Sequence, residues 1–417
     1  MVESAPTAGQ KRRIATILAT YALRLAGQGI AFFLFAKVLG AGNFGYVVAA
    51  LAILSPISPF VDMGAYSIVS RDIALGLKPI DVISENLTLM LVTLPSGIAV
   101  AVLFSHFTNP DANPFVLLMI SIAYLSISRT SSLLAAIQNT MVQKIPVIWV
   151  EAVSAVSLVS IGIFGLVYGY SLVYWSVAYA ITGLTVIFLS LILIRRYVGS
   201  FRLNFWPNAK RIKEGFTFSF GNSFQYIYTD VDKVILLRFA SADLTGVYGM
   251  ATRIASVALI PIGAVYSIFY PRFMKSGHGL DIPIRKLLGR VLIFSGGYAA
   301  VAVLTLLSSA ALIPRLLGSG YAAVPGIIHI LIISVAFQIF QTPFADTITG
   351  LGFQTYRTLL QGIACVVALS AAVILIPGNP RYGVVEANLI VHGSLLFMYM
   401  FVCFLLLNRR KGSENIL

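Results

Sequence analysis

The stretch "FAKVLGAGNFGYVVAA" at residues 35–50 returns in altered form as "LLRFASADLTGVYGMA" at residues 236–251. Each copy runs from the end of one apolar segment, across a short turn, into the start of the next. Four pairs of landmarks share an offset of 200 or 201 residues: Lys37 and Arg238, Gly45 and Gly246, the tripeptide YSI at 66–68 and at 266–268, and Arg71 and Arg272. This nearly constant offset predicts an internal duplication that divides the chain into two similar halves.

The composition is that of a membrane protein: 58% of the residues are hydrophobic, 11% are charged, and the mean hydropathy is +0.91. About 20 apolar residues are enough for one helix to cross a bilayer. Segments of roughly that length occur at 14–36, 45–62, 86–106, 115–137, 146–167, 172–194, 216–238, 246–270, 289–313, 321–350, 357–377 and 383–407. We therefore expect an all-α polytopic membrane protein with about twelve transmembrane helices.

The basic residues predict the orientation of these helices. Of the 29 Lys and Arg, 21 fall in segments that would be cytoplasmic if the N-terminus is inside, 4 in external loops and 4 within helices. Short cytoplasmic loops of membrane proteins carry such an excess, so both termini are predicted to be cytoplasmic. The net charge of +14 is then explained by topology and by contact with anionic lipids, and we expect no nucleic-acid partner.

Six helices in each half give equivalent helices the same orientation, so the repeat is parallel and its pseudo-twofold axis lies along the membrane normal. The predicted parts are a cytoplasmic N-terminus at 1–13, a six-helix bundle at 14–194, a basic cytoplasmic linker at 195–215, a second six-helix bundle at 216–407 and a cytoplasmic tail at 408–417.

The stretch "FAKVLGAGNFGYVVAALAILSPISPFVDMGAYSIVSRDIA" (35–74) resembles the opening of Wzx-type polysaccharide flippases, which belong to the MOP exporter superfamily. The matching residues are Leu39, Gly40, Phe44, Gly45, Tyr46, Asp62, Gly64, Arg71, Ile73 and Ala74. In the second half, "YTDVDKVILLRFASADLTGVYGMATRI" (228–254) is similar to the corresponding family pattern. Its matching residues are Asp232, Gly246, Tyr248, Ala251 and Arg253.

The resemblance implies a secondary transporter for surface polysaccharide biosynthesis. It would move a polyprenyl-pyrophosphate-linked oligosaccharide from the cytoplasmic to the outer leaflet by alternating access. It implies a multi-pass monomer in a prokaryotic cytoplasmic membrane, without a cofactor, with H⁺ or Na⁺ as a coupling ion and polysaccharide polymerase machinery as a further partner. The sequence contains no G-x-x-x-x-G-K-[ST] phosphate loop, in agreement with this class of transporter.

Arg24 is the first candidate for the substrate site. It lies about ten residues into the first predicted helix, so it is roughly 15 Å deep. A charged residue at that depth is a functional candidate by default, and Gln28 shares its helix face. A guanidinium offers planar, permanently charged donors for a pyrophosphate. The related lipid-linked peptidoglycan-precursor flippases use arginines in their first and eighth helices, where this chain has Arg24 and Arg253.

Other polar residues in the predicted helices complete the candidate substrate site: Arg129, Asn222 and Gln225. Each has a structural alternative. Arg24 could pair with a carboxylate of another helix, Arg129 could pair with Glu151, and polar amides most often join helices to each other.

The segment "DVDK" (230–233) holds the candidates for ion coupling, Asp230, Asp232 and Lys233. Together with Arg253 they form either a salt-bridged cluster that holds two helices together or a cation site. The gate candidates are Asp62, Arg71 and Asp346 near cytoplasmic helix ends and Pro56, Pro59 and Pro261, which would bend their helices.

Two other functions remain alternatives at this stage. An exporter of small organic cations or drugs, similar to the MATE transporters, would need a more acidic cavity than these helices suggest. A membrane glycan polymerase or transferase would need a sizeable catalytic loop, and the predicted external loops are short. The four histidines are scattered singly, so we expect neither a metal site nor an enzyme.

Overall fold

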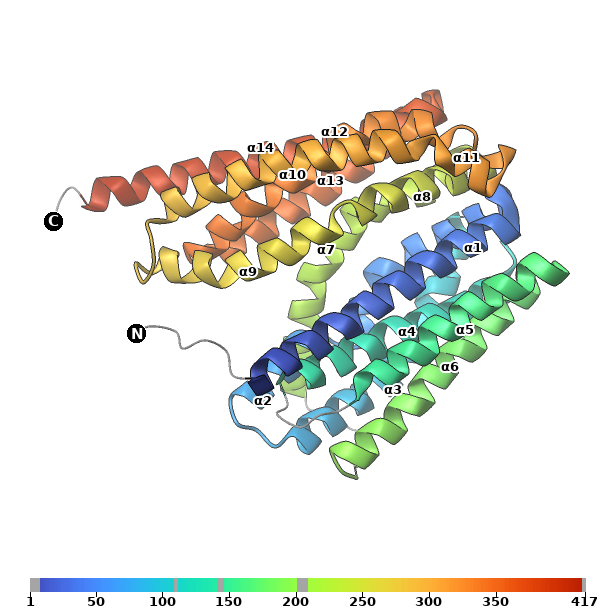
Figure 1. Ribbon diagram of the computed structural model, residues 1–417, viewed down its shortest axis with the longest axis horizontal. Helices are drawn as coiled ribbons and strands as arrows, with labels where there is room; N and C mark the ends of the chain where they lie inside the picture. The colour runs from blue at the N-terminus through green and yellow to red at the C-terminus, as the bar shows by residue number, and fades with distance from the viewer. Residues whose placement is uncertain (1–7, 109–111, 141–145, 201–208, 415–417) are drawn as a thin grey trace. The chain divides into compact units, whose positions relative to one another are not determined.

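The structure is a computed structural model that describes residues 8–108, 112–140, 146–200 and 209–414. All regular elements of this part are helical, which confirms the all-α class (Figure 1). The helices are α1 (Ala8–Val61), α2 (Ala65–Ala74), α3 (Pro79–Thr108), α4 (Pro114–Thr140), α5 (Val147–Tyr168), α6 (Leu172–Tyr197), α7 (Ala209–Phe239), α8 (Ala242–Val257), α9 (Ile260–Gly277), α10 (Ile284–Ala310), α11 (Leu312–Leu317), the 3₁₀ helix η1 (Ser319–Tyr321), α12 (Val324–Gly350), α13 (Gln354–Gly378) and α14 (Pro380–Glu414).

Within the described ranges, nine helices are long and apolar enough to cross a membrane, and ten if the bent pair α8 and α9 forms one span. The chain is therefore a multi-pass helical membrane protein. The arrangement of twelve spans in two bundles with cytoplasmic termini stays a prediction. The predicted N-terminus, linker and tail fall partly outside the described residues.

Helix α1 contains two predicted spans, 14–36 and 45–62, in one helix of 54 residues. That is about 80 Å of helix, far more than the hydrocarbon core of about 30 Å requires. The break occurs at Gly40, whose φ of 71° and ψ of 169° are not helical. A residue without a Cβ adopts this positive φ at little cost. The short turn predicted between these two spans is thus a kink at one glycine.

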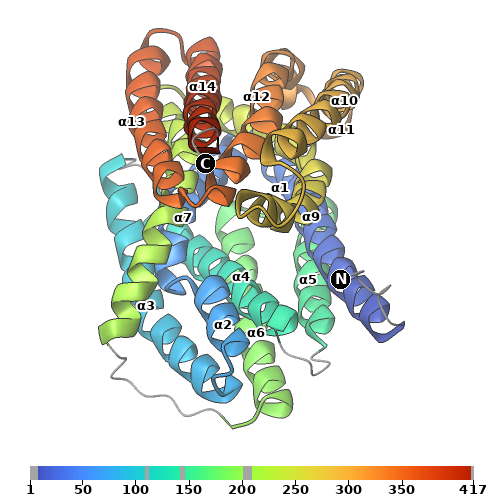
Figure 2. The ribbon, with the colours of Figure 1, turned by 90° about the vertical axis from the view of Figure 1, so that its left-hand side faces the viewer.

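The chain forms two compact units, each with its own core. Unit 1 comprises Met1–Gly40 and Ala50–Ser223, and unit 2 comprises Ala41–Ala49 and Phe224–Leu417. In unit 1, α4 packs along α6 and also against α2. Phe35 of α1 meets the fully buried Trp175 of α6 edge to face, with ring centroids 5.1 Å apart. In unit 2, α14 packs between α12 and α13, and α12 also packs against α8, α9 and α10 (Figure 2).

The two glycines of the internal repeat pack against each other's backbone in unit 2. A Cβ on Gly45 would collide with the carbonyl of Ala242 and the nitrogen of Gly246, and a Cβ on Gly246 would collide with the carbonyl of Ala41. Both positions therefore need glycine for close approach of the two turns. Gly45 and Gly246 match each other in the repeat, and they are also the residues at which the two copies touch.

Two prolines in unit 1 are accommodated by serines of the same helix. Pro56 and Pro59 lack the N–H groups that would bond the carbonyls of Ala52 and Ser55. Ser55 Oγ donates to the carbonyl of Ala52 at 3.4 Å, and Ser58 Oγ donates to the carbonyl of Ser55 at 2.8 Å. These side chains satisfy the freed carbonyls in an apolar setting, where no water would do so.

In unit 2, α8 and α9 meet at a bend of 44°, just before Pro261. The sequence predicts a bent helix here, and the structure places the break at residues 258–259. The hydroxyl of Tyr298 in α10 donates to the carbonyl of Ala258 at 2.6 Å and satisfies one acceptor at the break.

We predict that Gly45→Ala and Gly246→Ala each destabilise the protein by at least about 1–3 kcal/mol, because the added methyl group overlaps backbone atoms that cannot rotate away. Thermal unfolding of the purified protein in detergent measures this. Gly289→Ala in α10 is the matched control, since its Cβ would meet no atom within 4 Å. Equal unfolding temperatures for the three variants would contradict the close contact.

Candidate functional site

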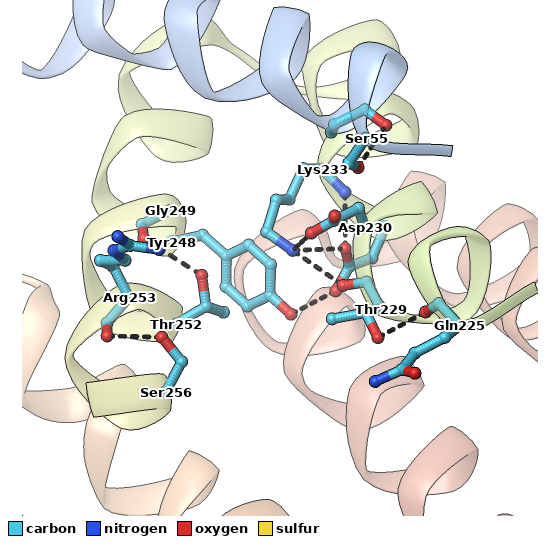
Figure 3. Close-up of polar contacts among 12 residues, drawn as sticks. Ser55, Gln225, Thr229, Asp230, Lys233, Tyr248, Gly249, Thr252, Arg253 and Ser256 are labelled. Atoms are coloured by element: carbon cyan, nitrogen blue, oxygen red, sulfur yellow. Dashed lines mark hydrogen bonds and ion pairs between the residues drawn. The ribbon is translucent and has the colours of Figure 1, made fainter. Parts of the chain in front are cut away.

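Lys233 of α7 is the centre of a buried charge cluster in unit 2 (Figure 3). Its ammonium group donates to Asp230 Oδ1 at 2.8 Å, to the carbonyl of Thr229 at 2.8 Å and to Asp232 Oδ1 at 3.4 Å. The side chain of Lys233 is only 10% exposed. A buried charge is tolerated when it is paired and hydrogen-bonded, and here the three ammonium protons have three oxygen acceptors.

Tyr248 of α8 connects this cluster to a second helix. Its hydroxyl donates to Asp232 Oδ2, and its ring centroid lies 5.9 Å from the ammonium of Lys233. The structure thus brings together Asp230, Asp232 and Lys233 as predicted. Arg253, also predicted for this cluster, extends away from Lys233 on the other side of the Tyr248 ring (Figure 3).

The polar network continues into α12 and α14. Ser334 Oγ donates to Asn388 Oδ1 at 2.6 Å, and Gln338 Nε2 donates to Ser334 Oγ at 3.4 Å. A cavity of about 60 Å³ lies next to this network and to Lys233. His392, one helical turn after Asn388, also lines the cavity.

Most of this network was not predicted from the sequence. Tyr248 was matched only as part of the family pattern, and Ser334, Asn388 and His392 were not among the candidate residues. The four side chains come from three helices, so no spacing along the chain links them. The one local signal was the pair Asn388 and His392, whose i,i+4 spacing puts both on one helix face.

Unit 1 holds the second group of intramembrane charges. Arg24 in α1 is half-buried, and its guanidinium lies 4.7 Å from the ring centroid of Tyr21, one turn earlier. Glu151 of α5 is 3% exposed, and it interacts electrostatically with the charge of Arg24. Arg24 makes no salt bridge within 4.0 Å among the residues that the structure describes.

Arg129 of α4 pairs with Asp62, not with Glu151. Its Nη1 lies 3.6 Å from Asp62 Oδ2, so the sequence-based pairing of Arg129 with Glu151 is wrong. Asp62 lies in the turn after α1, where its Oδ1 accepts a hydrogen bond from the amide of Gly64 at 3.1 Å. The turn places Gly64 at φ 68°, and the side chain of Asn86 donates to the carbonyl of Asp62. Asp62 therefore connects its own turn to α3 and α4, and such contacts between distant segments cannot be predicted from the sequence.

Arg71 joins α2 to the first turns of α7. It lies 2.8 Å from Asp72 and 2.9 Å from Glu214, and Arg211 of α7 also pairs with Asp72. The hydrogen bond from Arg71 lowers the pKa of the Glu214 carboxyl below its usual value. This pair is present at neutral pH and is lost only as the pH falls through that lowered pKa.

Further along, α7 also contacts the end of α1. Ser219 Oγ donates to the carbonyl of Pro59 at 2.6 Å, and Ser223 Oγ donates to the carbonyl of Pro56 at 2.7 Å. The gate candidates Pro56, Pro59 and Arg71 thus all contact α7.

The remaining candidates are spread over both units. In unit 2, Asp346 of α12 pairs with Arg357 of α13 at 3.2 Å, and Gln225 is exposed. In unit 1, Gln28 is half-buried and Asn222 is exposed. The described part of the chain contains no group of three or more His, Cys, Asp or Glu side chains that could hold a metal ion.

The fold is shared with solved transporters at low sequence identity. A lipid II flippase, MurJ, in an inward closed conformation is 15% identical with a TM-score of 0.67, over 93% of this chain and 87% of that one. An inward-facing MATE multidrug resistance transporter of the MOP superfamily is 12% identical with a TM-score of 0.66, over 94% and 99%. A MOP superfamily transporter from Pyrococcus furiosus, described as having a binding pocket of reverse polarity, is 12% identical with a TM-score of 0.55, over 94% of each chain.

A family model described as "Polysaccharide biosynthesis protein" matches residues 11–276, well over half of the chain. The protein belongs to this family. Comparison with curated proteins gave no significant match. At this identity the solved structures establish the fold, which the chain shares with a lipid II flippase and with MATE transporters of the MOP superfamily.

We predict that Asp62→Asn destabilises the protein more than Asp346→Asn. The pair of Asp62 and Arg129 is the more deeply buried, with side-chain exposures of 2% and 13% against 7% and 30% for Asp346 and Arg357. Removing one charge of a buried pair costs about 3–5 kcal/mol, whereas more exposed pairs contribute about 0–1 kcal/mol. Thermal unfolding in detergent compares the two, and an equal or reversed order would show that burial does not govern these pairs.

Proposed function

We propose that the protein flips a polyprenyl-pyrophosphate-linked oligosaccharide from the cytoplasmic to the outer leaflet of a prokaryotic cytoplasmic membrane, for surface polysaccharide biosynthesis. The family match and the fold support a transporter of this kind. The observation that carries the substrate class is the state of the intramembrane cations. Within the predicted spans, Arg129 and Lys233 pair with aspartates, as does Arg357 at a helix end, and Arg253 lies beside the Lys233 cluster, whereas Arg24 forms no ion pair in the described residues.

Arg24 therefore keeps its guanidinium donors for a ligand. Its contact with the ring of Tyr21 holds the planar group in place without occupying those donors, since a cation over an aromatic face leaves its N–H edge accessible. Two parallel hydrogen bonds from a guanidinium match two phosphate oxygens, which a lysine cannot reproduce. The pyrophosphate of a lipid-linked sugar is such a ligand.

Side chains beside Arg24 in unit 1 supply groups that suit a sugar. The hydroxyl of Tyr21 interacts with Tyr66 and Asn139, and Asn139 Nδ2 donates to the Tyr66 hydroxyl at 3.2 Å. Tyr66 is 45% exposed, so its ring remains available for contact. An accessible aromatic ring and an amide beside a guanidinium suit a cargo that carries both a phosphate and a carbohydrate.

The other predicted contacts remain part of the proposal: Gln28, Arg129, Arg253, Asn222 and Gln225. Arg129 is the least available of them for a ligand, because it already pairs with Asp62.

We propose that transport follows alternating access by a monomer, with bending at Pro56, Pro59 and Pro261 and with Asp62, Arg71 and Asp346 at the gates. A coupling ion, H⁺ or Na⁺, and a contact with polysaccharide polymerase machinery belong to the same proposal.

Export of small organic cations is the second candidate function. The similarity in fold to the MATE transporter is about as strong as that to the lipid II flippase, and Glu151 is a buried carboxylate in unit 1. The available guanidinium of Arg24 favours an anionic cargo over a cationic one, because like charges in a medium of low dielectric repel strongly.

We predict that Arg24→Ala lowers the flipping rate about 10- to 100-fold, because hydrogen bonds to a charged group contribute about 1.5–3 kcal/mol. Arg24→Lys should lose less, since it keeps the charge but not the paired donors. The measurement is the amount of lipid-linked glycan left on the cytoplasmic face of cells that depend on this protein, with its membrane level monitored. Lys37→Ala, an exposed cation further along α1, is the matched control.

Normal export by a stably inserted Arg24→Ala would make Arg24 a structural residue and remove the basis for the substrate class. If deletion of the whole gene left lipid-linked glycans unchanged, export of organic cations would become the first candidate.

A further inference from the structure

The ammonium group of Lys233 occupies a site built from oxygen atoms. Two carboxylates, Asp230 and Asp232, and the carbonyl of Thr229 surround it at 2.8–3.4 Å, and the hydroxyl of Tyr248 donates to the other oxygen of Asp232. Carboxylate and carbonyl oxygens are the ligands that hard metal cations prefer. The group bound here is instead a cation attached to the chain.

The surroundings of Lys233 have room for a small hydrophilic species. The adjoining cavity of about 60 Å³ has a polar side, formed by Lys233 and by hydroxyl, amide and imidazole side chains, and an apolar side formed by Ala255, Leu259, Leu331 and Val335. The polar residues besides Lys233 are Thr229, Thr252, Ser256, Ser334, Gln338, Asn388 and His392. A volume of this size holds a few water molecules but not a sugar ring.

His392 is a second and independent sign of a ligand at this place. It is 2% exposed, it lines the cavity, and its Nδ1 has no hydrogen-bond partner in the described structure. A buried polar atom without a partner is costly, so such atoms usually meet water or an ion. Its ring is held edge-on by Tyr228, with centroids 6.1 Å apart, so this position is fixed by packing.

We propose that unit 2 contains a monovalent-cation site that the chain fills with its own lysine. While Lys233 is in place, its ammonium group donates hydrogen bonds to the carboxylate oxygens and its charge repels any soluble cation. When the side chain is shortened, the two carboxylates and the enlarged cavity bind a small monovalent cation from solution. Of the two coupling ions in the proposed function, this leaves only H⁺ at Asp230 and Asp232 and places any Na⁺ coupling elsewhere in the chain.

The size of the bound group indicates which cations should replace it. An ammonium ion and K⁺ have similar radii, and their distances to oxygen are close to the 2.8 Å contacts of Lys233. We therefore expect NH₄⁺ and K⁺ to fit the vacated site at least as well as Na⁺. N-methyl-D-glucamine is too large for the cavity and serves as the inert cation.

Thermal unfolding of the purified protein in detergent, with each of these chloride salts at equal ionic strength, tests the proposal. A ligand that binds only the folded state raises the unfolding temperature in a concentration-dependent, saturable manner. This readout does not depend on transport, so its failure would leave the proposed flippase function untouched, and loss of glycan export would leave the cation site untouched.

The wild-type protein should unfold at the same temperature in all four salts. In N-methyl-D-glucamine chloride, Lys233→Ala should unfold at a lower temperature than the wild type. Adding NH₄⁺, K⁺ or Na⁺ should raise its unfolding temperature again, in a saturable manner. Lys233→Ala combined with Asp232→Asn should lose that regain, because one ligand and one charge are missing. Lys286→Ala, an exposed lysine in α10 of the same unit, should behave as the wild type.

Saturable stabilisation of the wild type by a small cation would overturn the proposal, because the site would then bind soluble ions with Lys233 in place. A Lys233→Ala protein that no small cation stabilises would overturn it as well. If Lys233→Ala does not fold, Lys233→Ser takes its place. Serine also shortens the side chain and vacates the carboxylate oxygens, so the same saturable regain is required of it.

Discussion

Backbone carbonyls and N–H groups inside the membrane must find their partners within the protein, and this constraint explains much of the structure. No water is available in the hydrocarbon core to satisfy a freed carbonyl or a lone charge. The carbonyls released by Pro56 and Pro59 are bonded by serines one residue before each proline. The carbonyl at the break between α8 and α9 is bonded by a tyrosine of α10. Bends of this kind are tolerated because the lost backbone bonds are replaced.

The same constraint separates the intramembrane charges by role. The ammonium of Lys233 has three oxygen acceptors, and Arg129 and Arg357 each have an aspartate. The pairs of Arg129 and Arg357 join separate helical segments, whereas Lys233 pairs within α7 and the hydroxyl of Tyr248 connects its cluster to α8. Separating any of these pairs would leave a bare charge in an apolar medium. Arg24 differs, since an aromatic ring supports it and the opposite charge of Glu151 acts on it without forming a salt bridge. A cation kept in this state costs stability, and binding an anionic cargo would compensate that cost.

Unit 1 also shows how the region after α1 is held to α7. Arg71 and Asp72 of α2 pair with Glu214 and Arg211 of α7, and two serine hydroxyls of α7 bond carbonyls near the end of α1. The pair of Arg71 and Glu214 is exposed, so it is screened and weak, whereas Arg211 and Asp72 are both buried. Several separate contacts, exposed and buried, therefore hold the start of α7 to α1 and α2.

The sequence alone determined the class of this protein and much of its helix pattern. Apolar runs of bilayer length predict helices wherever they occur, because a backbone in lipid must bond to itself. The repeat around Gly45 and Gly246 and the family motifs are local features, so they too were visible in the chain. The cluster of Asp230, Asp232 and Lys233 was predictable because its members lie within one turn of a helix.

Only the tertiary structure decided which distant residues meet. Spacing along a helix says which face a side chain occupies but not which helix lies opposite, so Arg129 could not be assigned to Asp62 rather than to Glu151. For the same reason Tyr248, Ser334, Asn388 and His392 were not recognised as the surroundings of Lys233. Pairing of buried charges depends on the packing of whole helices, which is set by side-chain shape over many contacts and not by any short stretch of sequence.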